Sequence, residues 1–157
     1  MFNKILVPLD GSKLAECIFP YVEELVKTKD VKEIVLFRVC EQPAIPADYP
    51  ANMPISWEKH VSDIMESAQG QCSLYLGEVE KRMKNLGVKV KMESCLGKAA
   101  DEIAKYAEHN KIDLIVMASH GRSGASRWAF GSVAEKVFRC TCVPVLMVKA
   151  PGCVPAV

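Results

Sequence analysis

The sequence predicts a single α/β domain, a three-layer doubly wound fold in which a five-stranded parallel sheet of order 3-2-1-4-5 carries helices on both faces. Short apolar runs alternate along the chain with longer stretches of helical periodicity. Several of these runs are continuously apolar, which is typical of strands buried on both sides of a parallel sheet. We expect the domain to span residues 1–149 and residues 150–157 to form a C-terminal tail.

The first strand is predicted at residues 4–9, an apolar run that stops at an Asp-Gly-Ser turn. Ser12 is expected to cap the helix that follows, in which apolar residues recur at helical spacing between Leu14 and Val26. Pro20 interrupts this pattern, so it predicts a kink or a shorter helix.

The second strand is predicted at residues 34–39, and the stretch 40–55 after it contains four prolines that exclude regular helix or strand. Residues 56–86 carry the longest helical pattern, with one apolar stripe that we expect to lie in the core. Gly70 and Gly77 lie inside this pattern and are expected to weaken or bend the helix.

The rest of the chain continues the alternation of strand and helix. Residues 88–95 alternate between apolar and polar, which indicates a strand at the edge of the sheet. The remaining predicted elements are a helix over 99–109, a strand over 112–118, a helix over 131–139 and a last strand over 143–148.

Composition excludes several classes of protein. The chain has 157 residues, with 20 Lys and Arg against 19 Asp and Glu. This balance argues against a nucleic-acid binder or a protein that binds anionic membranes. The N-terminal apolar run is too short for a signal peptide or a membrane span, so we expect a cytoplasmic protein.

The seven cysteines do not form a recognisable framework. No pair has Cys-x-x-Cys spacing, and none of the three histidines has a partner at metal-ligand spacing. We therefore expect neither a disulfide scaffold nor a zinc site, but reduced thiols in a cytosolic core. Cys153, in the tail, is expected to be exposed and reactive.

The candidate site follows the fourth predicted strand, because ligands of such sheets bind beyond the carboxyl ends of the strands, where the strand order reverses. The segment 118–121 ends in glycine, and after nine intervening residues Gly131-Ser132 opens a helix. Gly131 and the two residues after it should present free N–H groups at the positive end of that helix, which favours an anion. Arg122 and Arg127 between them suit a polyphosphate. Ordinary turn and capping chemistry would also explain these residue types.

These residues resemble the nucleotide motif of the universal stress protein family, which reads Gly, two residues, Gly, nine residues, then Gly with Ser or Thr. The spacing is intact here, with Ala118 in place of the first glycine. The similarity runs from Lys4 to Val148 and implies a fold of the adenine nucleotide alpha hydrolase type. It also implies an adenine nucleotide as ligand (ATP, ADP or AMP), with Mg²⁺ bridged by the phosphates.

The resemblance assigns the nucleotide site residue by residue. Asp10 is placed near the magnesium ion, because bound Mg²⁺ commonly keeps only one or two protein carboxylates; the alternative is that it caps the following helix. The assigned residues are Pro8, Leu9 and Asp10 beside adenine and ribose, the main chain of Val39 at the adenine, Gly97 close to the nucleotide, Met117 and Ala118 at the ribose, and Gly121, Arg122, Arg127, Gly131, Ser132 and Val133 at the phosphates.

The last strand is the predicted dimer edge. The family is typically dimeric there, so the resemblance implies a homodimer paired through Val143, Val145 and Met147. A protein partner of unknown identity is also expected.

Catalytic motifs are not found in the sequence. The Walker pattern, the dinucleotide fingerprint and the Gly-x-Ser-x-Gly elbow are all absent. Ser119 and His120 are neighbours whose side chains we expect to point in different directions, so no catalytic residue is assigned. Three hypotheses stay open: a nucleotide-binding regulatory module with at most slow hydrolysis, a nucleotide-free protein that acts by dimerisation and partner binding, and a weak ATPase or phosphotransferase.

Overall fold

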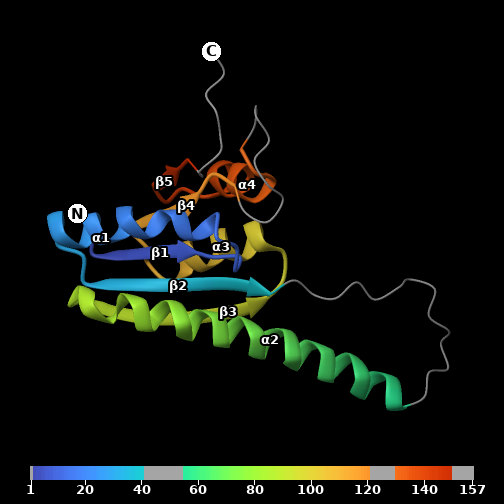
Figure 1. The fold of residues 1–157 in the computed structure, drawn as a ribbon. Coiled ribbons are helices and arrows are strands. Elements are labelled where there is room, and N and C mark those ends of the chain that lie inside the picture. Colours follow the sequence, from blue (N-terminus) through green and yellow to red (C-terminus); the bar gives the residue numbers. More distant parts are fainter. Residues whose placement is uncertain (1, 41–54, 121–129, 150–157) are drawn as a thin grey trace.

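The computed structural model describes residues 2–40, 55–120 and 130–149. Its five strands form one parallel sheet of order β3-β2-β1-β4-β5 (Figure 1), so the predicted fold class and strand order are confirmed. The elements are β1 Lys4–Pro8, α1 Phe19–Thr28, β2 Glu33–Cys40, α2 Ile55–Met83, β3 Lys89–Leu96, α3 Ala99–His109, β4 Leu114–Ala118, α4 Ser132–Cys140 and β5 Val145–Val148.

Two helices cover each face of the sheet, because successive residues of a strand point to opposite faces. In β1, Ile5 and Val7 pack with residues of α1 and α2, whereas Leu6 packs with residues of α3 and α4. All three side chains are fully buried, as the continuous apolar run predicts. Because β1 and β4 are neighbours in a parallel sheet, their carboxyl ends lie side by side. The candidate site lies at these ends.

The first helix is shorter than its apolar pattern. Residues Ala15–Ile18 form a 3-10 turn, and α1 begins at Phe19 with Pro20 in its first turn, where a missing N–H costs nothing. The Ser12 hydroxyl accepts a hydrogen bond from the Ala15 N–H at 3.1 Å. The interruption predicted from Pro20 is confirmed, and Ser12 caps the turn that precedes α1.

Helix α2 runs unbroken through Gly70 and Gly77, so the predicted weakening at these glycines does not interrupt it. Its apolar stripe is only partly in the core. Leu76 and Val79 are buried against the sheet, but Ile64 is 38% exposed. Figure 1 shows the reason, since the first half of α2 projects beyond the strand ends and has no sheet beneath it.

The last two strands are shorter than predicted. β4 begins at Leu114 rather than Ile112, and β5 begins at Val145 rather than Val143. Pro144 has no N–H to give to the sheet, and its carbonyl accepts a hydrogen bond from Ile115 at 2.9 Å before the regular pairing starts.

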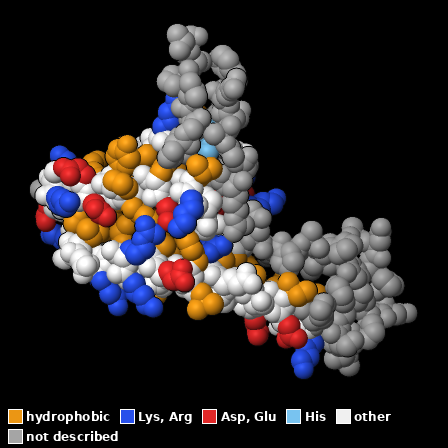
Figure 2. Space-filling model, in the orientation of Figure 1, with side chains coloured by type: hydrophobic (Ala, Val, Ile, Leu, Met, Phe, Trp, Pro, Cys, Tyr) orange, Lys and Arg blue, Asp and Glu red, His pale blue; other side chains and the backbone are white. Residues whose placement is uncertain are grey.

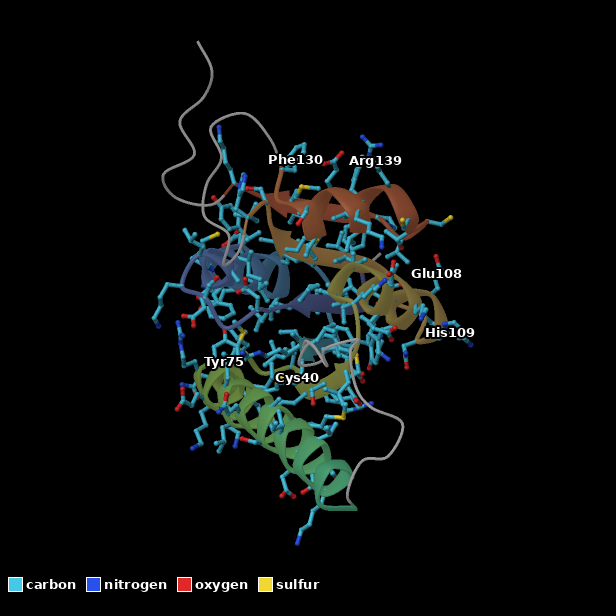
Figure 3. The ribbon with its side chains drawn as sticks, turned by 90° about the vertical axis from the view of Figure 1, so that its right-hand side faces the viewer. Cys40, Tyr75, Glu108, His109, Phe130 and Arg139 are labelled. Carbon is cyan, nitrogen blue, oxygen red and sulfur yellow. A yellow bond between two sulfur atoms is a disulfide. The ribbon has the colours of Figure 1, made fainter. Side chains whose placement is uncertain are left out.

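A disulfide joins Cys40, the last residue of β2, to Cys72 on α2. The expectation of reduced thiols throughout the core is therefore wrong for this pair. The two residues are 32 positions apart, and both are buried. Figure 3, which labels Cys40, shows it on the α2 side of the sheet. Three other cysteines of the described residues are free thiols: Cys95, Cys140 and Cys142.

The surface is mixed in character. Figure 2 shows basic, acidic and apolar side chains interspersed on the face that it presents. Across the described ranges, no helix combines the length and the apolar character needed to cross a membrane.

Candidate functional site

A cavity of about 250 Å³ opens at the carboxyl ends of β1 and β4, where the strand order reverses. This is the position at which doubly wound sheets bind their ligands. The structure brings together residues from six segments of the chain. Those that line the cavity are Pro8, Leu9, Asp10, Ala15, Phe37, Val39, Ala99, Ile103, Met117, Ala118, Ser119, His120, Gly131, Ser132, Val133 and Ala134.

The N-terminus of α4 forms one end of the cavity. The Gly131 N–H, which we expected to be free for an anion, donates instead to the Ser119 carbonyl at 2.8 Å. The helical hydrogen bonds begin when the Glu135 N–H donates to the Gly131 carbonyl at 2.9 Å. The amides of residues 132–134 therefore have no acceptor within the helix, as at any helix start, and their residues line the cavity. The run of amides without a helical acceptor thus begins one residue later than predicted.

Gly131 is required for space rather than for an unusual backbone conformation. Its φ is −59°, which any residue can adopt. A Cβ atom added there would lie 3.1 Å from the Ser119 carbonyl oxygen and 3.4 Å from the His120 Cα. The main chain after β4 therefore packs directly on the N-cap of α4, and a side chain at position 131 would push them apart.

Ala118 stands where the family motif has its first glycine. It is the last residue of β4, where it pairs with Val148 of β5. Among the described residues other than glycine, only Lys111 has a positive φ. Ala118 therefore keeps ordinary extended backbone, and its methyl group causes no left-handed strain.

Asp10 lies in the turn after β1 and faces the cavity. Its carboxylate accepts a hydrogen bond from the Ser12 N–H at 2.8 Å, which stabilises the turn. Gly11 has a φ of +86°, and a Cβ there would lie 2.9 Å from the Arg38 guanidinium. The turn thus needs glycine for its conformation, and Arg38 packs beneath it.

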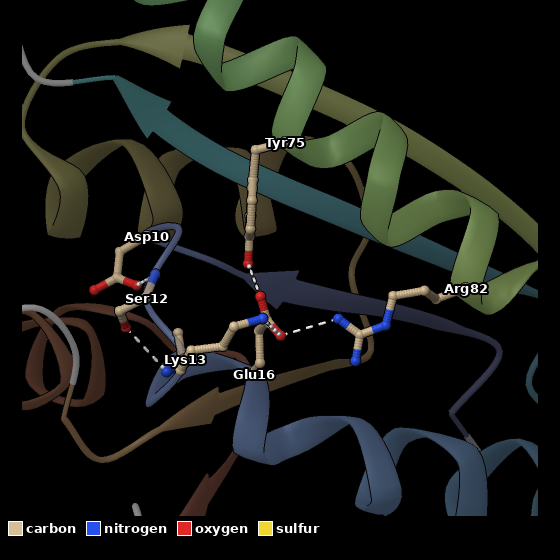
Figure 4. A network of polar contacts seen from close by, with 7 residues as sticks. Asp10, Ser12, Lys13, Glu16, Tyr75 and Arg82 are labelled. Atoms are coloured by element: carbon tan, nitrogen blue, oxygen red, sulfur yellow. Dashed lines mark hydrogen bonds and ion pairs between the residues drawn. The ribbon is translucent and has the colours of Figure 1, made fainter.

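A polar network supports this turn from the side of α2 (Figure 4). The Glu16 carboxylate accepts hydrogen bonds from Arg82 at 2.9 Å, from Lys13 at 3.3 Å and from the Tyr75 hydroxyl at 3.3 Å. Burial opposes ionisation of Glu16, but the Arg82 and Lys13 contacts outweigh it and lower the pKa of its carboxyl. Burial, together with the Glu16 carboxylate, raises the pKa of the Tyr75 hydroxyl.

The other end of the cavity is apolar. Phe37 and Val39 alternate along β2 on the face covered by α3, and Ala99 and Ile103 stand one helical turn apart on α3. Gly97, predicted close to the ligand, is not among the lining residues. Its N–H donates to the Cys40 carbonyl at 3.2 Å, and it packs against Glu102.

Several lining residues were missed by the sequence analysis. Phe37 lies two residues before the predicted Val39 on the same face of β2, so it carried a usable signal. The other missed residues are Ala15, Ala99, Ile103, Ser119, His120 and Ala134. Gly121, Arg122 and Arg127, all predicted at the phosphates, lie outside the described residues.

Ser119 and His120 do not point in different directions, so that prediction is wrong. Their side chains hydrogen-bond to each other, with the Ser119 Oγ 3.0 Å from the His120 Nδ1. Residues after a strand end no longer follow the alternation on which the prediction depended.

A protein-built metal site is not evident in the part of the chain that the structure describes, since no three metal-ligating side chains cluster there. Asp10 offers one carboxylate at the cavity. That donor set fits a magnesium ion held mainly by ligand phosphates.

Comparison with known proteins finds relatives that match almost the whole of this chain. The family model described as the universal stress protein family matches residues 1–149. Universal stress protein MJ0531 of Methanocaldococcus jannaschii is 34% identical over 153 residues, which cover 96% of this chain and 84% of the relative. MJ0577 of the same organism is 30% identical over 156 residues, covering 95% and 96%.

Solved structures show the same fold. The MJ0577 structure matches with a TM-score of 0.80 at 28% identity, covering 97% of this chain and 99% of that one. An Arabidopsis thaliana universal stress protein family member with AMP bound matches with a TM-score of 0.65 at 19% identity, covering 96% and 93%.

Proposed function

Because the chain belongs to the universal stress protein family, we propose that it binds an adenine nucleotide, ATP in the first place, and acts as a regulatory module. One observation carries the proposal: the first amides of α4 open into a cavity that has an apolar far end. The AMP complex of the Arabidopsis protein shows that this fold accommodates such a ligand.

The adenine ring is placed at the apolar end, between Phe37, Val39 and Ala99. A planar base buries well against aromatic and aliphatic side chains, and the main chain of Val39 supplies edge hydrogen bonds. The ribose then lies over Pro8 to Asp10 and the end of β4. Mg²⁺, when bound, would neutralise phosphate charge, with Asp10 as its protein ligand.

The phosphates are placed on the amides of residues 132–134. These N–H groups carry the positive end of the α4 dipole, which favours an anion without any charged side chain. The Ser132 hydroxyl adds a donor. Most of the lining is apolar or main chain, an arrangement that suits binding better than turnover, so we infer at most slow hydrolysis.

The test is direct. Protein purified without added nucleotide is denatured and the released small molecules are identified, and ATP is then titrated calorimetrically with and without Mg²⁺. We expect the wild type to bind and Gly131→Val to lose at least about 100-fold in affinity, because the added side chain separates α4 from the end of β4. Gly70→Ala is the matched control, since a Cβ there meets nothing within 4 Å.

The outcomes separate the hypotheses. A wild type that releases no nucleotide and gives no heat with ATP would be a nucleotide-free family member. Steady turnover of ATP that disappears in Gly131→Val would identify an ATPase or phosphotransferase instead.

We also propose a homodimer through β5. This strand pairs only with β4 among the described strands, so its outer edge is open. Val145 and Met147 face the α3 and α4 side, whereas Leu146 is 37% exposed. A monomer mass in light scattering at micromolar concentration would contradict this pairing.

A further inference from the structure

A second cavity, of about 320 Å³, lies between the edge strand β3 and helix α3. In the described sheet β3 pairs only with β2, and none of its residues is fully buried, so its α3 side is only partly covered. Phe37 is the one residue that also lines the first cavity. The residues around the second cavity are Phe37 of β2, Glu93, Ser94 and Cys95 of β3, and Glu102, Lys105, Tyr106 and His109 of α3.

The second cavity has the size and the inner wall of a small-molecule site. Its volume is at the lower end of the range of roughly 300–1,000 Å³ that ligand pockets occupy, so a ligand must be compact. The inner wall is aromatic, because the buried ring of Phe37 packs on the ring of Tyr106 with their centroids 4.6 Å apart. Rings of this kind favour an aromatic ligand, which buries its apolar surface against them.

The two carboxylates that line the second cavity are both neutralised by lysines. The Lys91 ammonium lies 2.6 Å from the Glu93 carboxylate, and the Lys105 ammonium lies 2.9 Å from the Glu102 carboxylate. A charged ligand would have to compete with these ion pairs for its partner. The lining therefore favours an uncharged molecule.

Two polar side chains at this cavity have hydrogen-bonding capacity that the described chain does not use. The Tyr106 hydroxyl is buried without a partner there, although buried polar groups are normally paired. Burial, and then the Glu93 carboxylate, raise the pKa of this hydroxyl, so it keeps its proton and is a donor. The Nδ1–H of His109 donates to the Lys105 carbonyl at 2.7 Å, since a carbonyl can only accept. In the neutral ring, Nε2 of His109 is therefore an acceptor.

We propose that the second cavity binds a small uncharged aromatic molecule of the phenol type, which offers both a hydrogen-bond donor and an acceptor. Its ring packs against Phe37 and Tyr106, its O–H donates to Nε2 of His109, and its oxygen accepts from the Tyr106 hydroxyl. The two polar side chains stand three residues apart on α3, at the spacing of neighbours on one helix face. The nearby Glu93 side chain is 33% exposed and is free to rotate as the ligand enters. This site does not depend on nucleotide binding.

The experiment compares three probes that differ by one group. Phenol carries a donor and an acceptor, anisole keeps the acceptor but has no O–H, and toluene has neither. Each probe is titrated into the protein, and the NMR shifts of the backbone amides give both the dissociation constant and the place of binding. We expect phenol to bind most tightly and toluene most weakly, with saturating shifts at Ser94, Cys95, Tyr106 and His109.

Three variants assign the two hydrogen bonds. His109→Leu should weaken phenol binding roughly fivefold and leave anisole and toluene within about twofold, because only phenol has a donor. Tyr106→Phe should weaken phenol and anisole by a similar factor and leave toluene unchanged. Glu108→Gln is the matched control, since Glu108 is exposed, adjoins His109 (Figure 3) and does not line the cavity. All three probes should bind to it as to the wild type.

Tyr106→Phe also has an expected effect in the absence of ligand. It keeps the ring and removes a buried hydroxyl that has no partner, so its midpoint of unfolding in urea should equal or exceed that of the wild type. A midpoint clearly below the wild type would mean that the protein itself pairs the hydroxyl, and would overturn the inference.

Three ligand results would overturn it as well. They are a wild type that phenol does not saturate, saturating shifts confined to the residues of the first cavity, and an equal loss of all three probes in His109→Leu. The ATP titrations described above are separate measurements, so none of these results decides the proposed function.

Discussion

The two ends of the cavity are held in place by different parts of the chain. At the β4 end, main-chain hydrogen bonds fix the position of the chain: Ser119 bonds to Val148 at 2.7 Å and to Gly131 at 2.8 Å. At the β2 end, contacts between side chains fix it. Cys40 is bonded to Cys72 of α2, and the Arg38 guanidinium packs over the Tyr75 ring at 4.8 Å.

This difference determines how each end responds to change. A main-chain contact at van der Waals distance leaves no room for an added atom, so even a single methyl group forces the two segments apart. At the β2 end several side chains make the contacts, so the remaining ones keep the cavity in place when one is lost. We therefore expect substitutions at the β4 end to reduce ligand affinity, and substitutions at the β2 end to reduce mainly the free energy of unfolding.

The largest effect on stability is expected from the disulfide. Cys72→Ser opens a loop of 32 residues, which should lower the free energy of unfolding by about 3–4 kcal/mol on the chain-entropy estimate. Urea denaturation of the oxidised wild type and the variant measures this difference. Cys140→Ser is the control, since that thiol is free and exposed.

The same comparison can be made without substitution. Reducing the wild type should reproduce the stability of Cys72→Ser, and reductant should leave the variant unchanged. An unfolding midpoint of the wild type that is insensitive to reductant would contradict a structural role for the bond.

The next effect compares Gly131 at the β4 end with Gly11 of the β1 turn, which packs against the Arg38 side chain of β2. In Gly131→Ala the added methyl meets the Ser119 carbonyl, so we expect roughly 10-fold weaker ATP binding. In Gly11→Ala it meets the end of the Arg38 side chain, which can move and does not line the cavity. That variant should lose about 1–2 kcal/mol of stability from its left-handed backbone, with ATP affinity within about threefold.

Calorimetry and denaturant unfolding on both variants measure the two quantities. Equal losses of ATP affinity at positions 11 and 131 would remove the distinction between main-chain and side-chain support of the cavity.

The features predicted correctly from the sequence are those that depend on local periodicity and turn residues. Every strand and helix was expected, and α3 was predicted at its observed bounds, Ala99–His109. The helix start at Gly131 was also readable, because glycine and serine there mark an N-cap. These features depend on residues that are close together in the chain.

The remainder depends on contacts between distant residues. Nothing near Cys40 indicates that α2 will bring Cys72 against it, and the projecting half of α2 has the same apolar spacing as the buried half. The Ser119–His120 bond depends on how the chain leaves β4, which periodicity does not describe. The acceptor of the Gly131 N–H, the Ser119 carbonyl, is likewise set by tertiary packing.

The smallest effect concerns the network behind the β1 turn. Glu16 is ionised in the folded state more readily than in the unfolded chain, because the contacts with Arg82 and Lys13 lower the pKa of its carboxyl despite burial. A lowered folded-state pKa contributes stability that is present above the unfolded value of about 4.3 and is lost as the pH falls through the folded value. Glu16→Gln should therefore cost roughly 0.5–1 kcal/mol at pH 7, and this cost should shrink toward zero near pH 3.

Urea unfolding at several pH values measures this dependence, with Glu24→Gln on the exposed face of α1 as the control. Glu16 is held by three separate side chains, Arg82, Lys13 and Tyr75. The loss of stability in Glu16→Gln should therefore stay far below that caused by removing the disulfide. A cost for Glu16→Gln that is as large at pH 3 as at pH 7 would mean that packing of the side chain, and not its charge, supports this end of the cavity.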